Sequence, residues 1–192
     1  KGSAPLLNAA APIDFVSANA AARAAVARSG TSFAAGMAIL PKRRRAAMHA
    51  IYAFCREVDD IADDQGRDAA ARMRALAQWR EEIARVEAGA PHSPIGAALA
   101  LAMREFALPM RECRMMIEGM EMDATGPIVA PSRARLADYT RRVAGAVGLL
   151  SMPVFGAPAG AASDRFALAL GDALQLTNIL RDVAEDAGVG RV

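Results

Sequence analysis

Cysteine, histidine and aromatic residues are scarce in this chain. It has two cysteines, two histidines and 5% aromatic residues among 192 positions. Cys55 and Cys113 form no Cys-x-x-Cys pair, and His49 and His92 are far apart in sequence. The pattern therefore predicts neither a disulfide framework nor a zinc site. Isolated cysteines are typical of proteins whose thiols stay reduced, so we expect a cytoplasmic protein.

A large excess of one charge is also absent. The 23 Lys and Arg residues and 21 Asp and Glu residues leave a formal net charge of +2. Nucleic-acid-binding domains usually carry a strongly basic surface, so no nucleic-acid partner is predicted. The exception is the basic run at residues 42–45, where cations at an expected helix start oppose the helix dipole. The run is either a solvated helix start or a contact with phosphate groups. These phosphates would belong to a membrane surface, as a peripheral contact, or to a bound substrate.

An uninterrupted membrane-spanning segment is not predicted either. Residues 143–163 carry no charge, which is long enough to consider a span. However, Pro153, Pro158 and several glycines would break a spanning helix. We predict a buried helix end, a loop and the start of the next helix. Gly145 and Gly148 leave room on one helix face for either a long ligand or a close helix crossing.

Sustained alternation of polar and apolar residues, the sign of a half-buried strand, is absent as well. Alanine and leucine abound, which favours helices. We predict an all-α protein, with an N-terminal segment and first helix at 1–28 and a single helical domain at 29–192. The expected helices span 14–27, 41–64, 67–87, 95–106, 110–123, 132–150 and 162–187, and residues 29–36 are expected to turn.

Two acidic segments stand out from this background. In the first, Tyr52, Arg56, Asp59 and Asp63 recur at helical spacing and share one face. Adjacent like charges destabilise an isolated helix, so clustered carboxylates need a compensating partner. A single stripe of this kind is usually a solvated helix face.

The second acidic segment repeats the pattern with Gln175, Asn178, Asp182 and Asp186. Two such stripes on separate helices could face each other across a cavity. Magnesium prefers oxygen ligands and takes one or two carboxylates from a protein. The pair of stripes therefore predicts a site for a hard divalent cation.

The two segments resemble the aspartate-rich signatures of the squalene/phytoene synthase family, the head-to-head isoprenyl diphosphate synthases. They are similar to Tyr-x-x-x-Arg-x-x-Asp-x-x-x-Asp and Gln-x-x-Asn-x-x-Arg-Asp-x-x-x-Asp, and every defining position matches. Residues 30–33, 118–123 and 139–148 also resemble family segments. In the short diphosphate-binding turn only Ser32 matches directly, because Gly30 stands where the family has serine. The similarity runs from about residue 29 to residue 191.

The resemblance implies an isoprenoid-synthase-type helical bundle around a central cavity. It implies a Mg²⁺ site, with Mn²⁺ as an alternative, made by Asp59, Asp63, Asn178, Asp182 and Asp186. It implies binding of prenyl diphosphate substrates by Ser32, Tyr52, Arg56, Gln175, Asn178 and Arg181. The catalytic residues implied are Asp59, Asp63, Asp182, Asp186 and Tyr139.

Within the family, the sequence is most similar to bacterial members of the hopanoid pathway. The reaction this implies is head-to-head condensation of two farnesyl diphosphates to presqualene diphosphate, for squalene and hopanoid biosynthesis, without a requirement for NADPH. Two alternatives stay open: condensation of two geranylgeranyl diphosphates to phytoene, and a non-catalytic assembly factor. Family members continue through further helices after the second motif, so we expect a chain truncated at its C-terminus.

Overall fold

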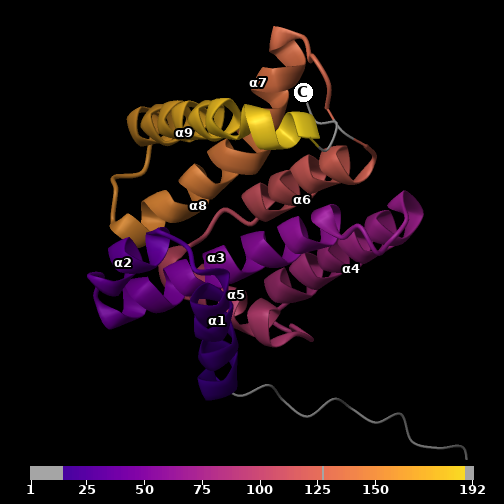
Figure 1. The fold of residues 1–192 in the computed structure, drawn as a ribbon. Coiled ribbons are helices and arrows are strands. Elements are labelled where there is room, and N and C mark those ends of the chain that lie inside the picture. Colours follow the sequence, from indigo (N-terminus) through magenta and orange to yellow (C-terminus); the bar gives the residue numbers. More distant parts are fainter. Residues whose placement is uncertain (1–14, 127, 189–192) are drawn as a thin grey trace, which may run out of the picture.

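The computed structural model describes residues 15–126 and 128–188, with the side chains of residues 16–126 and 128–183. Within these ranges every regular element is a helix and none is a strand, as expected (Figure 1). The elements are α1 (Phe15–Ser29), α2 (Phe33–Ala38), α3 (Lys42–Asp63), α4 (Ala69–Glu87), α5 (Pro94–Phe106), α6 (Arg111–Ala124), α7 (Arg133–Thr140), the π-helical turn η1 (Arg141–Gly145), α8 (Ala146–Phe155) and α9 (Ala161–Gly188).

Two predicted elements differ from the structure. Residues 29–36 do not simply turn, because α2 begins directly after Ser32. The single helix expected at 132–150 is divided by the π-helical turn and extends to Phe155. Pro153 lies in the last turn of α8, and Gly156 with φ of 78° then ends the helix in the left-handed conformation.

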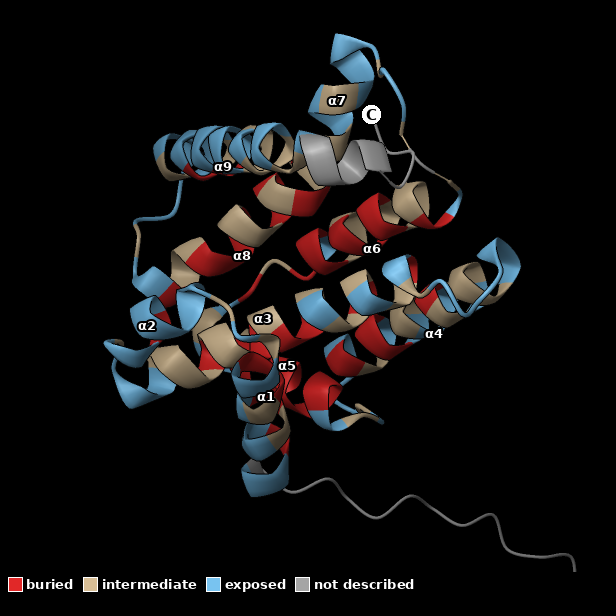
Figure 2. Ribbon diagram, in the orientation of Figure 1, coloured by how far each residue is buried: buried red, intermediate tan, exposed pale blue. Residues whose placement is uncertain are grey.

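The helix α3 lies at the centre of the bundle. It packs against α1, α4, α5, α6 and α8. Its buried face alternates small and large side chains, and Phe54 makes an edge-on contact with Trp79 of α4 at a ring-centroid distance of 5.4 Å. Figure 2 shows buried residues along α4, α5, α6 and α8, the helices that pack against α3 together with α1. The opposite face of α3 is therefore left for the polar stripe of the first acidic segment.

The helix α9 crosses α8 and η1 with almost no side chain between the backbones. A Cβ atom on Gly148 would lie 2.8 Å from the carbonyl oxygen of Ala167. A Cβ atom on Gly171 would lie 2.9 Å from the carbonyl carbon of Ala144. Real Cβ atoms essentially never approach other atoms this closely. Of the two roles left open for this glycine-containing stretch, Gly148 thus serves a close helix crossing.

A buried carboxylate joins α4 to the start of α5. Glu82 is only 5% exposed. Its Oε1 accepts hydrogen bonds from the backbone N–H groups of His92 at 2.9 Å and Ser93 at 2.8 Å, and its Oε2 accepts one from Arg85 at 2.9 Å. Gly96 leaves the space, because a Cβ there would lie 2.0 Å from Oε1. The unpaired N–H groups before α5 are thereby satisfied.

We expect the substitution Glu82→Gln to lower the free energy of unfolding at neutral pH by about 1–3 kcal/mol. Burial alone would raise the pKa of Glu82, but the donors from Ser93, Arg85 and His92 outweigh it and hold the pKa below the ordinary value of 4.5. A lowered folded-state pKa contributes stability above that ordinary value and loses it as the pH falls through the folded-state pKa. Urea unfolding at a series of pH values should show the difference between wild type and variant shrinking in acid.

The matched control for this prediction is Glu81→Gln. Glu81 is the exposed neighbour of Glu82, and its carboxylate lies 3.6 Å from the same Arg85. Exposed ion pairs contribute little, so this change should cost less than about 1 kcal/mol. A loss for Glu82→Gln that is the same at every pH would contradict the assigned role of its charge.

Candidate active site

The first acidic segment occupies the last three turns of α3. Arg56 forms ion pairs with two carboxylates of its own helix, Asp59 at 3.1 Å and Asp60 at 2.6 Å. Tyr52 and Asp59 are half-buried, whereas Arg56 and Asp63 are exposed. The predicted stripe is therefore present, and its arginine compensates part of the local negative charge.

Tyr139 connects this segment to α6. Its hydroxyl donates a hydrogen bond to Oδ2 of Asp123 at 3.0 Å. Burial, the hydrogen-bonded Asp123 and the nearby carboxylates of Asp59 and Asp63 raise the pKa of Tyr139 well above its usual value. The carboxylates of α3 and α6 thus act together on one phenol at the end of α7. The phenol stays protonated at neutral pH and is a hydrogen-bond donor.

Asp123 is a candidate site residue that the sequence prediction missed. It belongs to the segment 118–123, which was noted only for its family resemblance. Asp123 lies near the C-terminal end of α6, where Tyr139 can reach it. Its separation of sixteen positions from Tyr139 carries no helical periodicity. Only the tertiary structure, in which η1 packs against α6 and brings the end of α7 near it, reveals the pairing.

Arginines surround the acidic end of α6. Arg80 of α4 binds Glu121 through two hydrogen bonds, at 2.8 and 2.7 Å. Arg142 of η1 binds Asp138 at 3.0 Å and also contacts Glu118. Bidentate arginine–carboxylate pairs are strong and directional. These contacts hold α4, α6 and η1 around Asp123 and Tyr139.

The second acidic segment lies in the C-terminal half of α9. Arg181 binds its neighbour Asp182 through two hydrogen bonds, at 2.6 and 2.7 Å, and these lower the pKa of Asp182. Gln175 and Asn178 are half-buried. The side chain of Asp186 lies outside the described residues. The structure therefore describes the side chains of the predicted polar stripe from Gln175 to Asp182 and not that of Asp186.

The helix α8 packs against both motif-bearing helices. It contacts α3 on one side and α9 on the other, and Figure 1 shows it between them. Among the described side chains, no three His, Cys, Asp or Glu residues gather closely enough to hold a metal ion. The opposition of the two acidic segments across a cation site stays a prediction, as does the diphosphate contact of Ser32, which lies exposed before α2.

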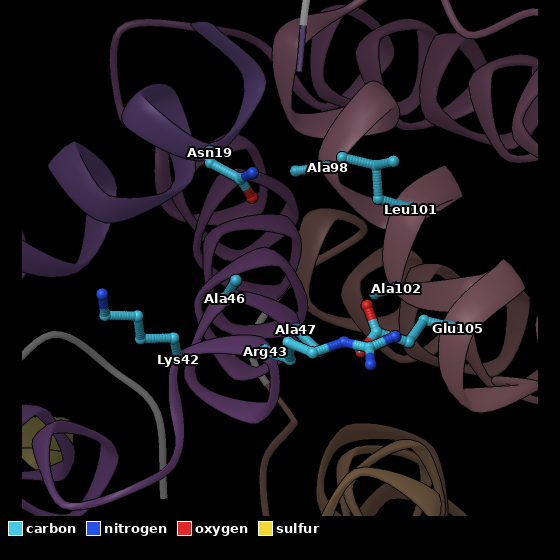
Figure 3. A pocket seen from close by; sticks show the side chains of 9 residues that line it. All are labelled: Asn19, Lys42, Arg43, Ala46, Ala47, Ala98, Leu101, Ala102 and Glu105. Carbon is cyan, nitrogen blue, oxygen red and sulfur yellow. The ribbon is translucent and has the colours of Figure 1, made fainter. Parts of the chain in front are cut away.

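Two grooves flank the N-terminal end of α3, away from the acidic segments. The smaller, about 350 Å³, is lined by α1, α3 and α5, and Arg43 reaches across it to Glu105 (Figure 3). The larger, about 740 Å³, lies between α1, α2 and α3. It is lined by Arg23, Lys42 and Arg45 together with alanine and valine side chains.

Most cations of the basic run at 42–45 make contacts with other parts of the protein. Arg45 donates to the carbonyl oxygen of Ala38 at 2.8 Å, at the end of α2. Arg44 donates to the carbonyl oxygen of Phe155 at 3.3 Å, at the end of α8. Cations are favourable beside helix C-termini. This explains why arginines stand at a helix start, where the dipole of their own helix opposes them.

Comparison with known proteins places this arrangement in one family. Residues 26–192 match the squalene/phytoene synthase family. Presqualene diphosphate synthase of Rhodopseudomonas palustris is 48% identical over 165 residues, covering 85% of this chain and 57% of that protein. Presqualene diphosphate synthase of Zymomonas mobilis is 48% identical over 161 residues, covering 84% of this chain and 55% of that protein. The chain thus spans little more than half the length of these relatives.

A plant relative and a solved structure agree. Phytoene synthase 3 of Zea mays is 40% identical over 163 residues, covering 80% of this chain and 37% of that protein. The crystal structure of squalene synthase HpnC from Alicyclobacillus acidocaldarius superposes with a TM-score of 0.83 at 30% identity, over 95% of this chain and 68% of that one. The isoprenoid-synthase-type fold expected from the sequence is confirmed. The chain belongs to the squalene/phytoene synthase family.

Proposed function

We propose that the protein condenses two farnesyl diphosphates head to head into presqualene diphosphate. The observation that carries the proposal is that Tyr139 binds Asp123 and lies near enough to Asp59 and Asp63 of the first acidic segment for their charge to act on its phenol. The higher identity to presqualene diphosphate synthases, 48% against 40% for the maize phytoene synthase, favours farnesyl over geranylgeranyl units. Both acidic motifs are complete, which argues against a non-catalytic assembly factor.

The residues at this site fit a divalent cation. Burial raises the pKa of Tyr139, and the carboxylates of α3 and α6 raise it further. Oxygen-rich, negatively charged surroundings of this kind suit Mg²⁺ or Mn²⁺. Asp59, Asp63, Asn178, Asp182 and Asp186 would hold the cation. When bound, it would supply Lewis-acid stabilisation of the departing diphosphate.

The arginines of both motifs would bind diphosphate oxygens. Arg56 and Arg181 now pair with carboxylates of their own helices. A guanidinium group offers forked donors that match phosphate oxygens and is always charged. Exchange of a carboxylate partner for diphosphate keeps each arginine paired, so the exchange does not strand an unpaired cation.

Tyr139 would act as a neutral donor and not as a base. Its raised pKa keeps the proton on the phenol. A donor positioned near developing negative charge stabilises it without reorganisation. In the structure Asp123 accepts the one hydrogen bond that this hydroxyl can donate, so donation to a substrate oxygen would require the proton to turn away from Asp123.

The product distinguishes this proposal from its rivals. Full-length protein supplied with Mg²⁺ and farnesyl diphosphate is expected to release presqualene diphosphate without NADPH, measured by mass spectrometry. Condensation of prenyl units requires no hydride, so NADPH should leave the yield of this intermediate unchanged. A C40 product from geranylgeranyl diphosphate, with farnesyl diphosphate ignored, would establish the phytoene alternative instead.

Two substitutions test the assigned groups in the full-length protein. Asp59→Asn should reduce kcat on the order of 10²–10³-fold, because it removes a charge from the predicted cation site. Tyr139→Phe should also reduce kcat, while far-UV circular dichroism stays unchanged. The control is Asp60→Asn, which removes the other carboxylate that pairs with Arg56 and should cost less than about tenfold. Equal losses at positions 59 and 60 would contradict the assignment.

The predicted peripheral membrane contact would use the corner between α2 and α3. Ile39 is 86% exposed and Phe33 is 64% exposed, beside the cation Lys42. Within the described residues no helix is both long and apolar enough to cross a membrane. Apolar side chains beside cations suit the surface of an anionic bilayer.

We expect the protein to sediment with anionic phosphatidylglycerol vesicles at low salt. It should be released by about 0.5 M salt, because salt shortens the Debye length and weakens the attraction between exposed cations and the anionic surface. The double substitution Ile39→Ser and Lys42→Ser should weaken the binding. Val129→Ser, at another exposed apolar position, is the control. Binding that the double variant retains in full would place the contact elsewhere.

A further inference from the structure

Three consecutive side chains at the π-helical turn reach three different partners. Tyr139 binds Asp123 of α6, and Thr140 binds Asp172 of α9. Arg141 lies 2.9 Å from Glu112, also on α6. Single π-helical turns inside helices are rare and frequently mark functional sites. The turn therefore joins the two helices that border the candidate site.

The hydrogen bond between Thr140 and Asp172 has the features of a specific contact. Thr140 is only 2% exposed, and its Oγ1 lies 2.6 Å from Oδ1 of Asp172. A hydroxyl bonded to a carboxylate at this distance is a charge-assisted bond, stronger than a neutral one. The same hydroxyl lies 3.2 Å from the carbonyl oxygen of Ala137, which is the weaker partner.

Small residues line the crossing of α9 with α8 and η1. Gly171 lies against the backbone of Ala144, and Ala167 lies against Gly148. These residues allow close approach and exclude rotations that would bring a larger side chain of α9 into the crossing, but they provide no directional contact. A short, directional bond beside this crossing specifies one orientation. Thr140 and Asp172 supply it immediately next to Gly171.

The orientation of α9 matters because Asp172 lies just before the second acidic segment. Gln175 stands three positions further along α9, on the same helix face, and Asn178 and Asp182 continue the stripe. On the other side of the bond, Thr140 is the next residue after Tyr139. The bond thus links the neighbour of Tyr139, which lies beside the first acidic segment, to the residue that stands just before the second acidic segment.

We propose that Thr140 and Asp172 are a positioning pair that sets the rotation and register of α9, and so the placement of the second acidic segment opposite Asp123 and Tyr139. Neither residue needs to touch substrate. The inference rests on the proposed function, because it concerns the same cation and diphosphate site. It adds two residues that belong to neither acidic motif.

The test measures Mn²⁺ binding to the full-length protein by electron paramagnetic resonance, with inorganic diphosphate as the probe for the substrate headgroup. Thr140→Val and Asp172→Ala should each weaken binding about tenfold, equivalent to roughly 1.4 kcal/mol. The double variant should be no weaker than either single variant, because both lose the same bond. Steady-state kinetics should show a matching rise in the metal concentration needed for half-maximal rate.

Conservative variants and a control make the test specific. Thr140→Ser keeps the hydroxyl and should bind Mn²⁺ within about twofold of wild type. Asp172→Asn keeps a neutral form of the bond, so it should weaken Mn²⁺ binding less than Asp172→Ala does. Ser151→Ala removes another buried hydroxyl, whose hydrogen bond goes to Val147 of its own helix, and should also bind normally. Asp172 is exposed, so its variants are expected to fold even if Thr140→Val does not.

The outcomes separate the alternatives. Normal Mn²⁺ binding by Thr140→Val and Asp172→Ala, with only a lower melting temperature, would make the pair purely structural and overturn the inference. Loss of binding in Asp172→Asn as severe as in Asp172→Ala would also overturn it, because the charge and not the bond would matter. Wild-type protein that binds no Mn²⁺ with diphosphate would overturn the proposed function itself.

Discussion

The hydrogen bond from Tyr139 to Asp123 holds the end of α7 against the end of α6, beside the carboxylates of α3. Carboxylates on neighbouring helices repel each other, and the fold must offset that cost. Arg56 does so on α3, while Arg80 and Arg142 bind the acids of α6. Charge compensation by these arginines thus permits acidic residues to gather at a site where Asp59 is half-buried and Asp63 is exposed.

The helix α3 makes this arrangement possible because it has one buried apolar face and one polar face. Its buried face places Phe54 against Trp79 and small alanines against neighbouring helices. Its polar face carries the acidic segment. The arginines at its start bind the ends of α2 and α8, so the position of α3 is set along its whole length. A rigid support of this kind keeps the carboxylates in place without requiring bonds between them.

The helix α9 depends on backbone contact in place of side-chain interlocking. Gly148 and Gly171 let it approach α8 and η1 closely, and its other face exposes Phe166, Leu170 and Leu174. The hydrogen bond from Thr140 to Asp172 adds a directional contact beside this crossing. The chain covers 57% of the Rhodopseudomonas palustris relative and 68% of the squalene synthase of known structure.

The sequence by itself determined the helical class, most helix bounds and the spacing of both acidic stripes, because helical periodicity and capping are local. It also led to the family through the complete motifs that carry Asp59 and Asp182. Only the tertiary structure decided that Asp123 meets Tyr139, that Gly148 serves a helix crossing, and that Arg44 and Arg45 bind helix ends. These are contacts between residues far apart in the chain or across a turn, and no local pattern encodes which distant groups packing brings together.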